Sequence, residues 1–140
     1  MSSDGSLEEL FFELASKNRM TILHELQGKS LRMQELARRL EVTPTEAFRQ
    51  LERLTAASLV HRQPDGKFAL AEYGKLVLQV SSSFEFISKH KDYFSTHAVT
   101  KLPAQFLGRL GELSRAEFEA DTIRSINKGA EAFTRAKQYI

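Results

Sequence analysis

The sequence predicts a mainly helical fold with one small β-hairpin, followed by a long helix and a short α-rich extension. Two observations lead to this prediction. Apolar residues recur three and four positions apart through most of the chain, as on one face of a helix. Between residues 60 and 70 this spacing gives way to two short segments around Pro64-Asp65-Gly66, a sequence typical of a hairpin turn.

The first helical segment is expected over residues 6–27. Ser6 and Glu9 have the spacing of a capping box. The segment carries two apolar faces rotated from each other, so we expect it to kink or break near residues 16–18. Gly28 ends it. The first face contains Leu7, Leu10, Phe11 and Leu14, and the second contains Ile22, Leu23 and Leu26.

Two short helices separated by a sharp turn follow. Thr43 is suited to cap the second helix, Pro44 to open it, and Glu46 to complete a capping box. We therefore expect the second helix to begin at about Pro44. The buried stripes are predicted to be Met33, Leu36, Ala37 and Leu40 on the first helix, and Ala47, Phe48, Leu51 and Leu54 on the second.

The hairpin completes the motif. Residues 60–63 and 67–70 are predicted to form two strands joined at residues 64–66, where Asp65-Gly66 supplies the backbone freedom that the turn needs. Helix, turn, helix and hairpin in this order form a winged helix-turn-helix, in which the second helix enters a DNA major groove and the hairpin is the wing.

The predicted DNA-contacting residues follow from this geometry. Arg49 and Gln50, on the outer face of the second helix, are expected to reach base edges, a guanidinium bridging guanine and an amide pairing with adenine. Arg62 and Lys67 on the wing are expected to contact phosphates. The Glu46 carboxylate could accept a hydrogen bond from cytosine N4, although its role in the capping box of the second helix is the favoured one. The full predicted set is Arg38, Arg39, Thr43, Thr45, Glu46, Arg49, Gln50, Arg53, Arg62 and Lys67.

The run LARRLEVTPTEAFRQLERLTAASLVHR resembles the ArsR-like winged-helix transcription regulators, in which a Leu-Ala-x-x-Leu helix precedes the recognition helix and a Leu-Val strand follows it. Ser58 departs from this pattern, because such sequences usually have Gly there. Since Gly is a preference and not a requirement at a helix end, we expect the helix either to end through Ser58 or to run slightly differently there.

Residues 72–90 are predicted to form a long helix whose first turn is weakened by Gly74. Its apolar stripe is too wide for a DNA-binding domain of this size to bury, so we expect it to meet a partner helix, from a second subunit or from downstream residues. A homodimer is favoured. The predicted dimer interface is Leu76, Val77, Val80, Phe84 and Ile87.

The order after residue 90 is less regular. Pro103, Gly108 and Gly111 divide the chain into short pieces, residues 113–117 offer another cap, and residues 130–140 have a helical pattern. Residues 118–126 fit either a strand or a helix. Because six of the ten Phe residues lie between Phe84 and Phe133, we expect this half to pack against something.

The segment FEFISKHKDYFSTHAVTKLPAQFLGRLGEL resembles the region that joins the winged helix to the sensing domain in archaeal regulators of the methanogenesis-regulator type. The resemblance implies a DNA-binding domain over residues 1–71, a linking and dimerisation helix over 72–95, and the start of a sensing domain over 96–140. It further implies that the chain stops within this sensing domain and that a small-molecule effector would require the complete one.

Composition narrows the function classes. The net charge is only +2, but residues 28–71 hold eight basic and five acidic side chains, a mild local excess that suits DNA binding. The chain has no cysteine and no apolar run of about 18 residues, so we expect a cytoplasmic protein without disulfides or a membrane span. No cofactor is expected.

No catalytic constellation or metal-ligand spacing is present, so an enzyme is not expected. His90, Asp92 and His97 match no established ligand pattern, and His24 and His61 are isolated. Two function classes remain. The first is a sequence-specific regulator that binds duplex DNA as a dimer, and the alternative is a winged-helix module that binds another protein.

Overall fold

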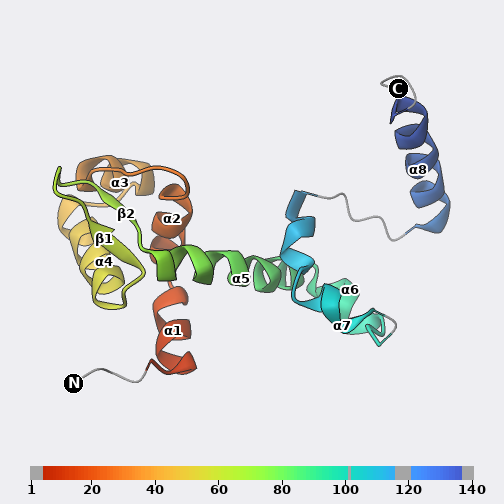
Figure 1. Ribbon diagram of the computed structural model, residues 1–140, viewed down its shortest axis with the longest axis horizontal. Helices are drawn as coiled ribbons and strands as arrows, with labels where there is room; N and C mark the ends of the chain where they lie inside the picture. The colour runs from red at the N-terminus through yellow and green to blue at the C-terminus, as the bar shows by residue number, and fades with distance from the viewer. Residues whose placement is uncertain (1–4, 101, 116–120, 137–140) are drawn as a thin grey trace.

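The computed structural model describes residues 5–100, 102–115 and 121–136. It confirms a mainly helical fold with one two-stranded antiparallel sheet, in the order of a winged helix-turn-helix (Figure 1). The elements are α1 (Leu7–Leu14), α2 (Lys17–Glu25), α3 (Met33–Leu40), α4 (Pro44–Ala56), β1 (Val60–Arg62), β2 (Phe68–Leu70), α5 (Glu72–Lys89), α6 (Lys91–Thr96), α7 (Ala104–Leu107), the 3-10 helix η1 (Leu110–Arg115) and α8 (Thr122–Ala136).

The predicted break in the first helical segment is confirmed. Helix α1 ends at Leu14, and α2 begins after Ser16, whose hydroxyl accepts a hydrogen bond from the Arg19 amide. Ser6 caps α1 in the same way, accepting from the Glu9 amide at 3.1 Å. Each helix start therefore satisfies one of its free N–H groups locally, and the chain can change direction between two short helices.

The second helix of the helix-turn-helix begins at Pro44, as predicted. Helix α3 ends at Glu41, which adopts the left-handed conformation with φ of 56° and turns the chain sharply. Thr43 then caps α4, its hydroxyl accepting from the Glu46 amide at 3.2 Å, and Pro44 occupies the first helical position. The sequence signals at residues 43–46 thus set where the recognition helix begins.

The wing has a third, single-residue partner that the sequence did not indicate. In the hairpin Val60 pairs with Leu70 and Arg62 with Phe68, and Gly66 makes the turn with φ of 84°. Leu31, just before α3, forms an isolated bridge to Phe68. The two residues exchange backbone hydrogen bonds of 3.0 and 2.8 Å, so the base of the wing is tied to the start of the helix-turn-helix.

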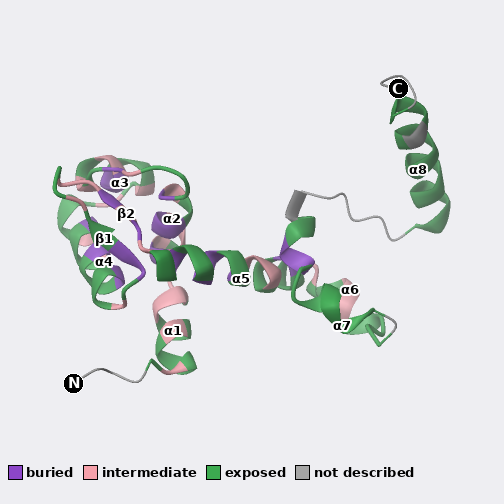
Figure 2. Cartoon of the chain, viewed as in Figure 1, coloured by how far each residue is buried: buried purple, intermediate pink, exposed green. Residues whose placement is uncertain are grey.

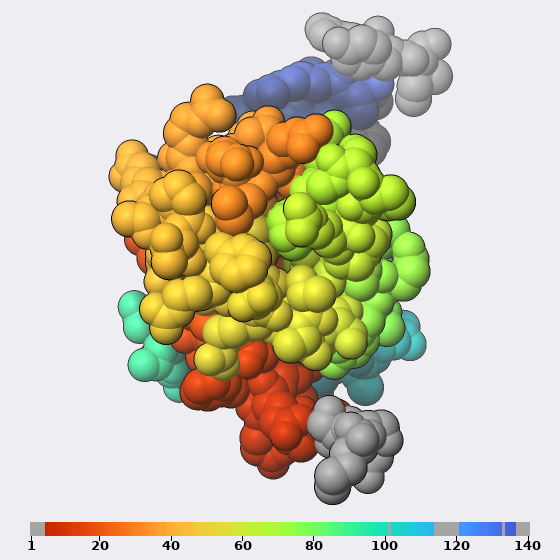
Figure 3. Space-filling view, turned by 90° about the vertical axis from the view of Figure 1, so that its left-hand side faces the viewer, coloured from red at the N-terminus to blue at the C-terminus, as the bar shows by residue number. Residues whose placement is uncertain are grey.

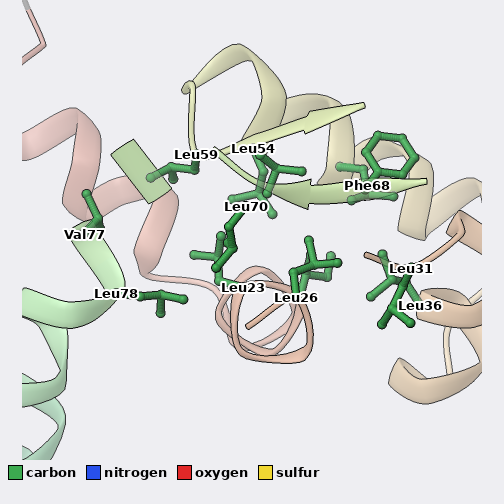
Figure 4. Packing of buried hydrophobic residues seen from close by; sticks show 13 residues of the cluster. Leu23, Leu26, Leu31, Leu36, Leu54, Leu59, Phe68, Leu70, Val77 and Leu78 are labelled. Atoms are coloured by element: carbon green, nitrogen blue, oxygen red, sulfur yellow. The ribbon is translucent and has the colours of Figure 1, made fainter. Parts of the chain in front are cut away.

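One hydrophobic core joins α2, α3, α4, the wing and the start of α5 (Figures 2 and 4). Ile22, Leu23, Leu36, Leu51 and Leu54 are fully buried in it, as their spacing predicts. Phe48 is a correction: its side chain was expected in the buried stripe of α4 but is 44% exposed. Positions 47, 51 and 54 already fill the inner face, and residue 48 lies one step around the helix.

Helix α4 ends through Ser58, as expected, and Ser58 has φ of 61°. An L residue in this left-handed conformation carries a steric cost that glycine avoids. We therefore expect Ser58→Gly to raise the free energy of unfolding by about 0.5 to 1 kcal/mol in urea denaturation. Ser58→Ala, which keeps the Cβ, is the control and should give no gain. A lower stability of the glycine variant would contradict this account of the turn.

Helix α5 has one face on the core and another toward solvent. Gly74, Val77, Leu78, Ser81 and Phe86 are buried. The apolar stripe on the opposite side is exposed: Leu76 by 58%, Val80 by 56%, Phe84 by 59% and Ile87 by 38%. Val77 is a correction, because it was predicted in the dimer interface but belongs to the core of its own chain, 9% exposed.

The structure requires a glycine at position 74, and the sequence pattern did not indicate why. Helix α5 passes so close to the end of α4 that a Cβ on residue 74 would collide with the carbonyl oxygen of Leu59. A similar approach occurs farther along, where η1 lies on α5 and a Cβ on Gly111 would collide with Ser82. Both glycines permit two backbones to come close.

Beyond α5 only part of the chain is packed. Leu110 of η1 is buried, and Gly111 donates to the Ser83 hydroxyl at 3.0 Å. Helix α8 includes much of the predicted helix at 130–140 and resolves residues 122–126 as helical; residues 116–120 and 137–140 lie outside the described part. Every residue of α8 whose side chain is described is exposed, so the expected packing of this half is not seen for α8.

Candidate nucleic-acid interface

Helix α3, helix α4 and the wing share one face of the molecule (Figure 3). This face shows α3 in orange, α4 in yellow and the wing in light green, with α1 in red below them. The short turn at Glu41 and the bridge from Leu31 to Phe68 hold these elements together. The residues predicted to contact DNA all come from these elements or from the cap of α4.

Arg49 is the most accessible of the predicted base readers. Its side chain is 74% exposed, and its contact with the Glu46 carboxylate is a long 3.7 Å. Thr45 is also exposed, whereas the Thr43 hydroxyl is occupied by the helix cap. An exposed ion pair of this length is weak, so the Arg49 guanidinium is available to another acceptor.

Gln50 lies differently from the sequence expectation. It was placed on the solvent face beside Arg49, but its side chain is half-buried and bonded on both ends. Its amide nitrogen donates to the Glu46 carboxylate, and its amide oxygen accepts from Arg19 at 3.0 Å. Gln50 therefore lies at the border between α4 and the start of α2.

Arg53 is held by α1. Its guanidinium donates to both carboxylate oxygens of Glu13, at 2.7 and 3.2 Å, and lies 5.1 Å from the centre of the Phe12 ring. The hydrogen bond and the negative charge of Glu13 raise the pKa of Arg53 above its ordinary value. A DNA phosphate would have to compete with Glu13 for this side chain.

The arginines of α3 border a shallow hollow of about 290 Å³ that Glu35, Arg38 and Arg39 line. Arg39 is paired with Glu25 of α2 at 2.7 Å. Arg38 is exposed and has no ion-pair partner within the part of the chain that the structure describes. Of these two arginines, Arg38 is the more readily available to a phosphate.

The wing brings together two arginines, of which the sequence analysis named one. Arg62 lies over the Phe68 ring at 5.9 Å, and Lys67 is 3.9 Å from Asp65. A Cβ on Gly66 would be 3.6 Å from Nη1 of Arg32 and 3.8 Å from Nη2 of Arg62, so both guanidinium groups reach the wing turn. Arg32 was missed because only the bridge at Leu31 brings it there.

Other kinds of site are not seen among residues 5–100, 102–115 and 121–136. These residues hold no cluster of three or more His, Asp or Glu side chains suited to a metal ion. His97 stacks on Tyr93 with ring centres 4.0 Å apart, and His24 pairs with Glu85 at 2.8 Å. In the same described residues, no helix has the length and apolar character to cross a membrane.

Comparisons with known proteins give one family match for the sequence and several similar solved structures. The profile of the family described as HVO_A0261 N-terminal domain matches residues 7–91, which is more than half of the chain. The chain is similar in structure to RV1404 from Mycobacterium tuberculosis, with 18% identity and a TM-score of 0.53 over 80% of this chain and 81% of that one. It is also similar to the YusO protein from Bacillus subtilis, with 19% identity and a TM-score of 0.52 over 79% of this chain and 82% of that one. No curated protein matches the sequence.

Proposed function

Since the chain belongs to the HVO_A0261 N-terminal domain family, and since its fold is a winged helix-turn-helix, we propose that it is a transcription regulator that binds duplex DNA. The observation that carries this proposal is the shared face of α3, α4 and the wing, where exposed arginines border the recognition helix. An α-helix of this kind fits the major groove, and flanking cations fit the phosphates on either side.

The residues on this face divide into two roles. Arg49, exposed at the second turn of α4, reads a guanine edge through its guanidinium. Arg62, Lys67 and Arg38 lie beside the helix and bind phosphates, with Arg32 added at the wing turn. Arg39 and Arg53 join them only when they leave Glu25 and Glu13.

The regulator acts as a homodimer through the exposed stripe of Leu76, Val80, Phe84 and Ile87 on α5. The stripe continues onto α1, where Phe11 meets the Phe84 ring edge-on with centres 5.9 Å apart. Phe11 and Phe84 also border an open apolar groove of about 540 Å³. A large apolar surface of this kind is typical of an interface, and a two-fold dimer would place two recognition helices about 34 Å apart.

The finer assignment is that the chain belongs with the archaeal ArsR-like regulators of the methanogenesis-regulator type. The motif residues 36–62 and the segment 84–113 support it. On this assignment residues 1–71 bind DNA, residues 72–95 link and dimerise, and residues 96–140 belong to a sensing domain. The protein would act in the cytoplasm and would have no catalytic role.

A protein-docking role is the second candidate. It is favoured by the acidic partners that neutralise Arg39 and Arg53 on the proposed DNA face. Salt dependence separates the two candidates, because counterion release makes DNA affinity fall steeply with salt. Binding to a protein alone, unchanged by moderate salt, would support the docking role and contradict the DNA-binding proposal.

The test compares a reading residue with a phosphate-binding one on duplexes first selected from random sequence. We expect Arg49→Ala to cost about 1 to 3 kcal/mol on the selected duplex and little on a scrambled one, because it removes a base contact. Lys67→Ala should weaken both and flatten the salt slope by about one unit. Titrations of both variants at several salt concentrations measure this, and equal losses from Arg49→Ala on the two duplexes would contradict its reading role.

A further inference from the structure

Arg19 is a buried arginine that the proposed function does not yet use. It lies at the start of α2, 8% exposed, and its guanidinium is fixed on several sides. Nε donates to the Glu13 carbonyl oxygen at 2.6 Å and lies 3.2 Å from the Glu13 carboxylate, and Nη2 donates to the Phe12 carbonyl oxygen at 2.8 Å. Nη1 is thereby directed at Gln50, 3.0 Å away.

The orientation of the Gln50 amide follows from its two neighbours. A guanidinium can only donate, so the amide oxygen must face Arg19. An ionised carboxylate can only accept, so the amide nitrogen must face Glu46. Reversing the amide would set donor against donor and acceptor against acceptor. One N–H of the Gln50 amide remains for a further partner.

This orientation restricts what Gln50 can recognise. Pairing with adenine needs the amide oxygen and nitrogen together on the base edge, the oxygen accepting from N6 and the nitrogen donating to N7. With its oxygen directed at a buried guanidinium, Gln50 can offer only a donor. A single donor fits any base edge that presents an acceptor, which includes guanine O6 or N7, thymine O4 and adenine N7. Adenine therefore gains no advantage over guanine or thymine, because its bidentate pair with the amide is lost.

We propose that Arg19 is a specificity-determining residue that acts through Gln50: it fixes the Gln50 amide as a single donor, so that α4 selects an acceptor edge and does not favour adenine at one base position. This inference rests on the proposed DNA-binding function and refines its target. It replaces the adenine contact that the sequence suggested for Gln50. Arg19 is a positioning residue, since its own side chain is buried and touches no base.

The test uses Arg19→Met, which removes all the donors but keeps a long apolar stem in the buried site. Once the Gln50 oxygen is released, the amide can turn to adenine. Duplexes are selected from random sequence by the wild type and by each variant. The base position at which Gln50→Ala removes the wild-type base preference is the position that Gln50 reads. With Arg19→Met, adenine should rise about five- to tenfold at that same position, the other positions being unchanged.

Arg109→Met is the control, because Arg109 is also held by a carboxylate, that of Glu112, but lies outside the proposed DNA-binding set and does not touch Gln50. It should leave the base preference at the Gln50 position as it is. Arg19→Lys keeps the positive charge but loses the planar guanidinium with its fixed donors, so it should also raise adenine at the Gln50 position. This variant replaces Arg19→Met in the test if the methionine variant does not fold. An unchanged preference with Arg19→Met, at a position that Gln50→Ala flattens, would overturn the proposal.

A second readout needs no DNA and so separates this inference from the proposed function. The side-chain NH2 signals of Gln50 in an amide NMR spectrum are identified by their loss in Gln50→Ala. These signals should shift in Arg19→Met and stay unchanged in Arg109→Met. If they move while the wild-type chain selects no duplex, the DNA-binding proposal fails and the orienting role of Arg19 stands. If they do not move, Arg19 does not orient Gln50.

Discussion

Gly74→Ala should lower the free energy of unfolding by about 3 kcal/mol. The new methyl group would meet the carbonyl oxygen of Leu59, and backbone atoms in a packed core cannot move aside as a flexible side chain does. Relief requires α5 to shift away from the end of α4, which would separate Val77 and Leu78 from the core. Urea denaturation followed by circular dichroism measures the loss.

Gly129→Ala is the control for this prediction. Gly129 also lies within a helix, but a Cβ there would meet nothing within 4 Å. Alanine favours helix over glycine by up to about 1 kcal/mol, so this variant should not be destabilised. Equal stabilities of Gly74→Ala and the wild type would show that the approach of α5 to Leu59 is not tight in solution.

Replacing Val80 and Phe84 together with glutamate should convert the proposed dimer to monomers and reduce DNA affinity by about a hundredfold or more. Both side chains are more than half exposed on α5, so the change introduces charge at the interface without disturbing the core. A monomer presents one recognition helix and loses the gain from binding two half-sites together. Analytical ultracentrifugation and duplex titration measure the two effects.

Gln79→Glu is the matched control, since residue 79 is exposed on the same helix but lies outside the stripe. It should leave both the assembly and the affinity nearly unchanged. If the wild-type chain sediments as a monomer at micromolar concentration, the dimer proposal is wrong. The stripe of Leu76, Val80, Phe84 and Ile87 would then serve some other contact.

The winged helix could be predicted because its signals are local. A helix start is indicated by Thr43 and Pro44, and a hairpin turn by Asp65-Gly66. The spacing of apolar residues by three and four predicts which helix faces are buried. Ser58 shows the same for a helix end, since the following chain direction requires a left-handed residue there whatever its type. Helix α4 begins at Pro44 as the pattern predicts, and each wing strand is one residue shorter than predicted.

The remaining features depend on contacts between distant segments. Nothing local in the sequence brings Arg19 to Gln50, because their hydrogen bond exists only once α2 packs on α4. Periodicity assigned Val77 to the outer stripe and Phe48 to the inner one, since both lie at the edge of their helix faces. The spacing of apolar residues on a helix does not determine whether a residue at the edge of its apolar face is buried or exposed. That depends on which neighbouring element packs against the helix.

The backbone bridge between Leu31 and Phe68 joins the two ends of the segment that holds α3, α4 and the wing tip. The chain enters at Leu31 and leaves at Phe68 with these two residues hydrogen-bonded to each other, so the helices α3 and α4 and the wing tip form a closed loop. Because its ends already lie side by side, a shift of the wing base is passed through two backbone hydrogen bonds to the start of α3. The wing and the start of α3 are thus expected to open together, and similar slow hydrogen exchange of the Leu31 and Phe68 amides would measure this coupling.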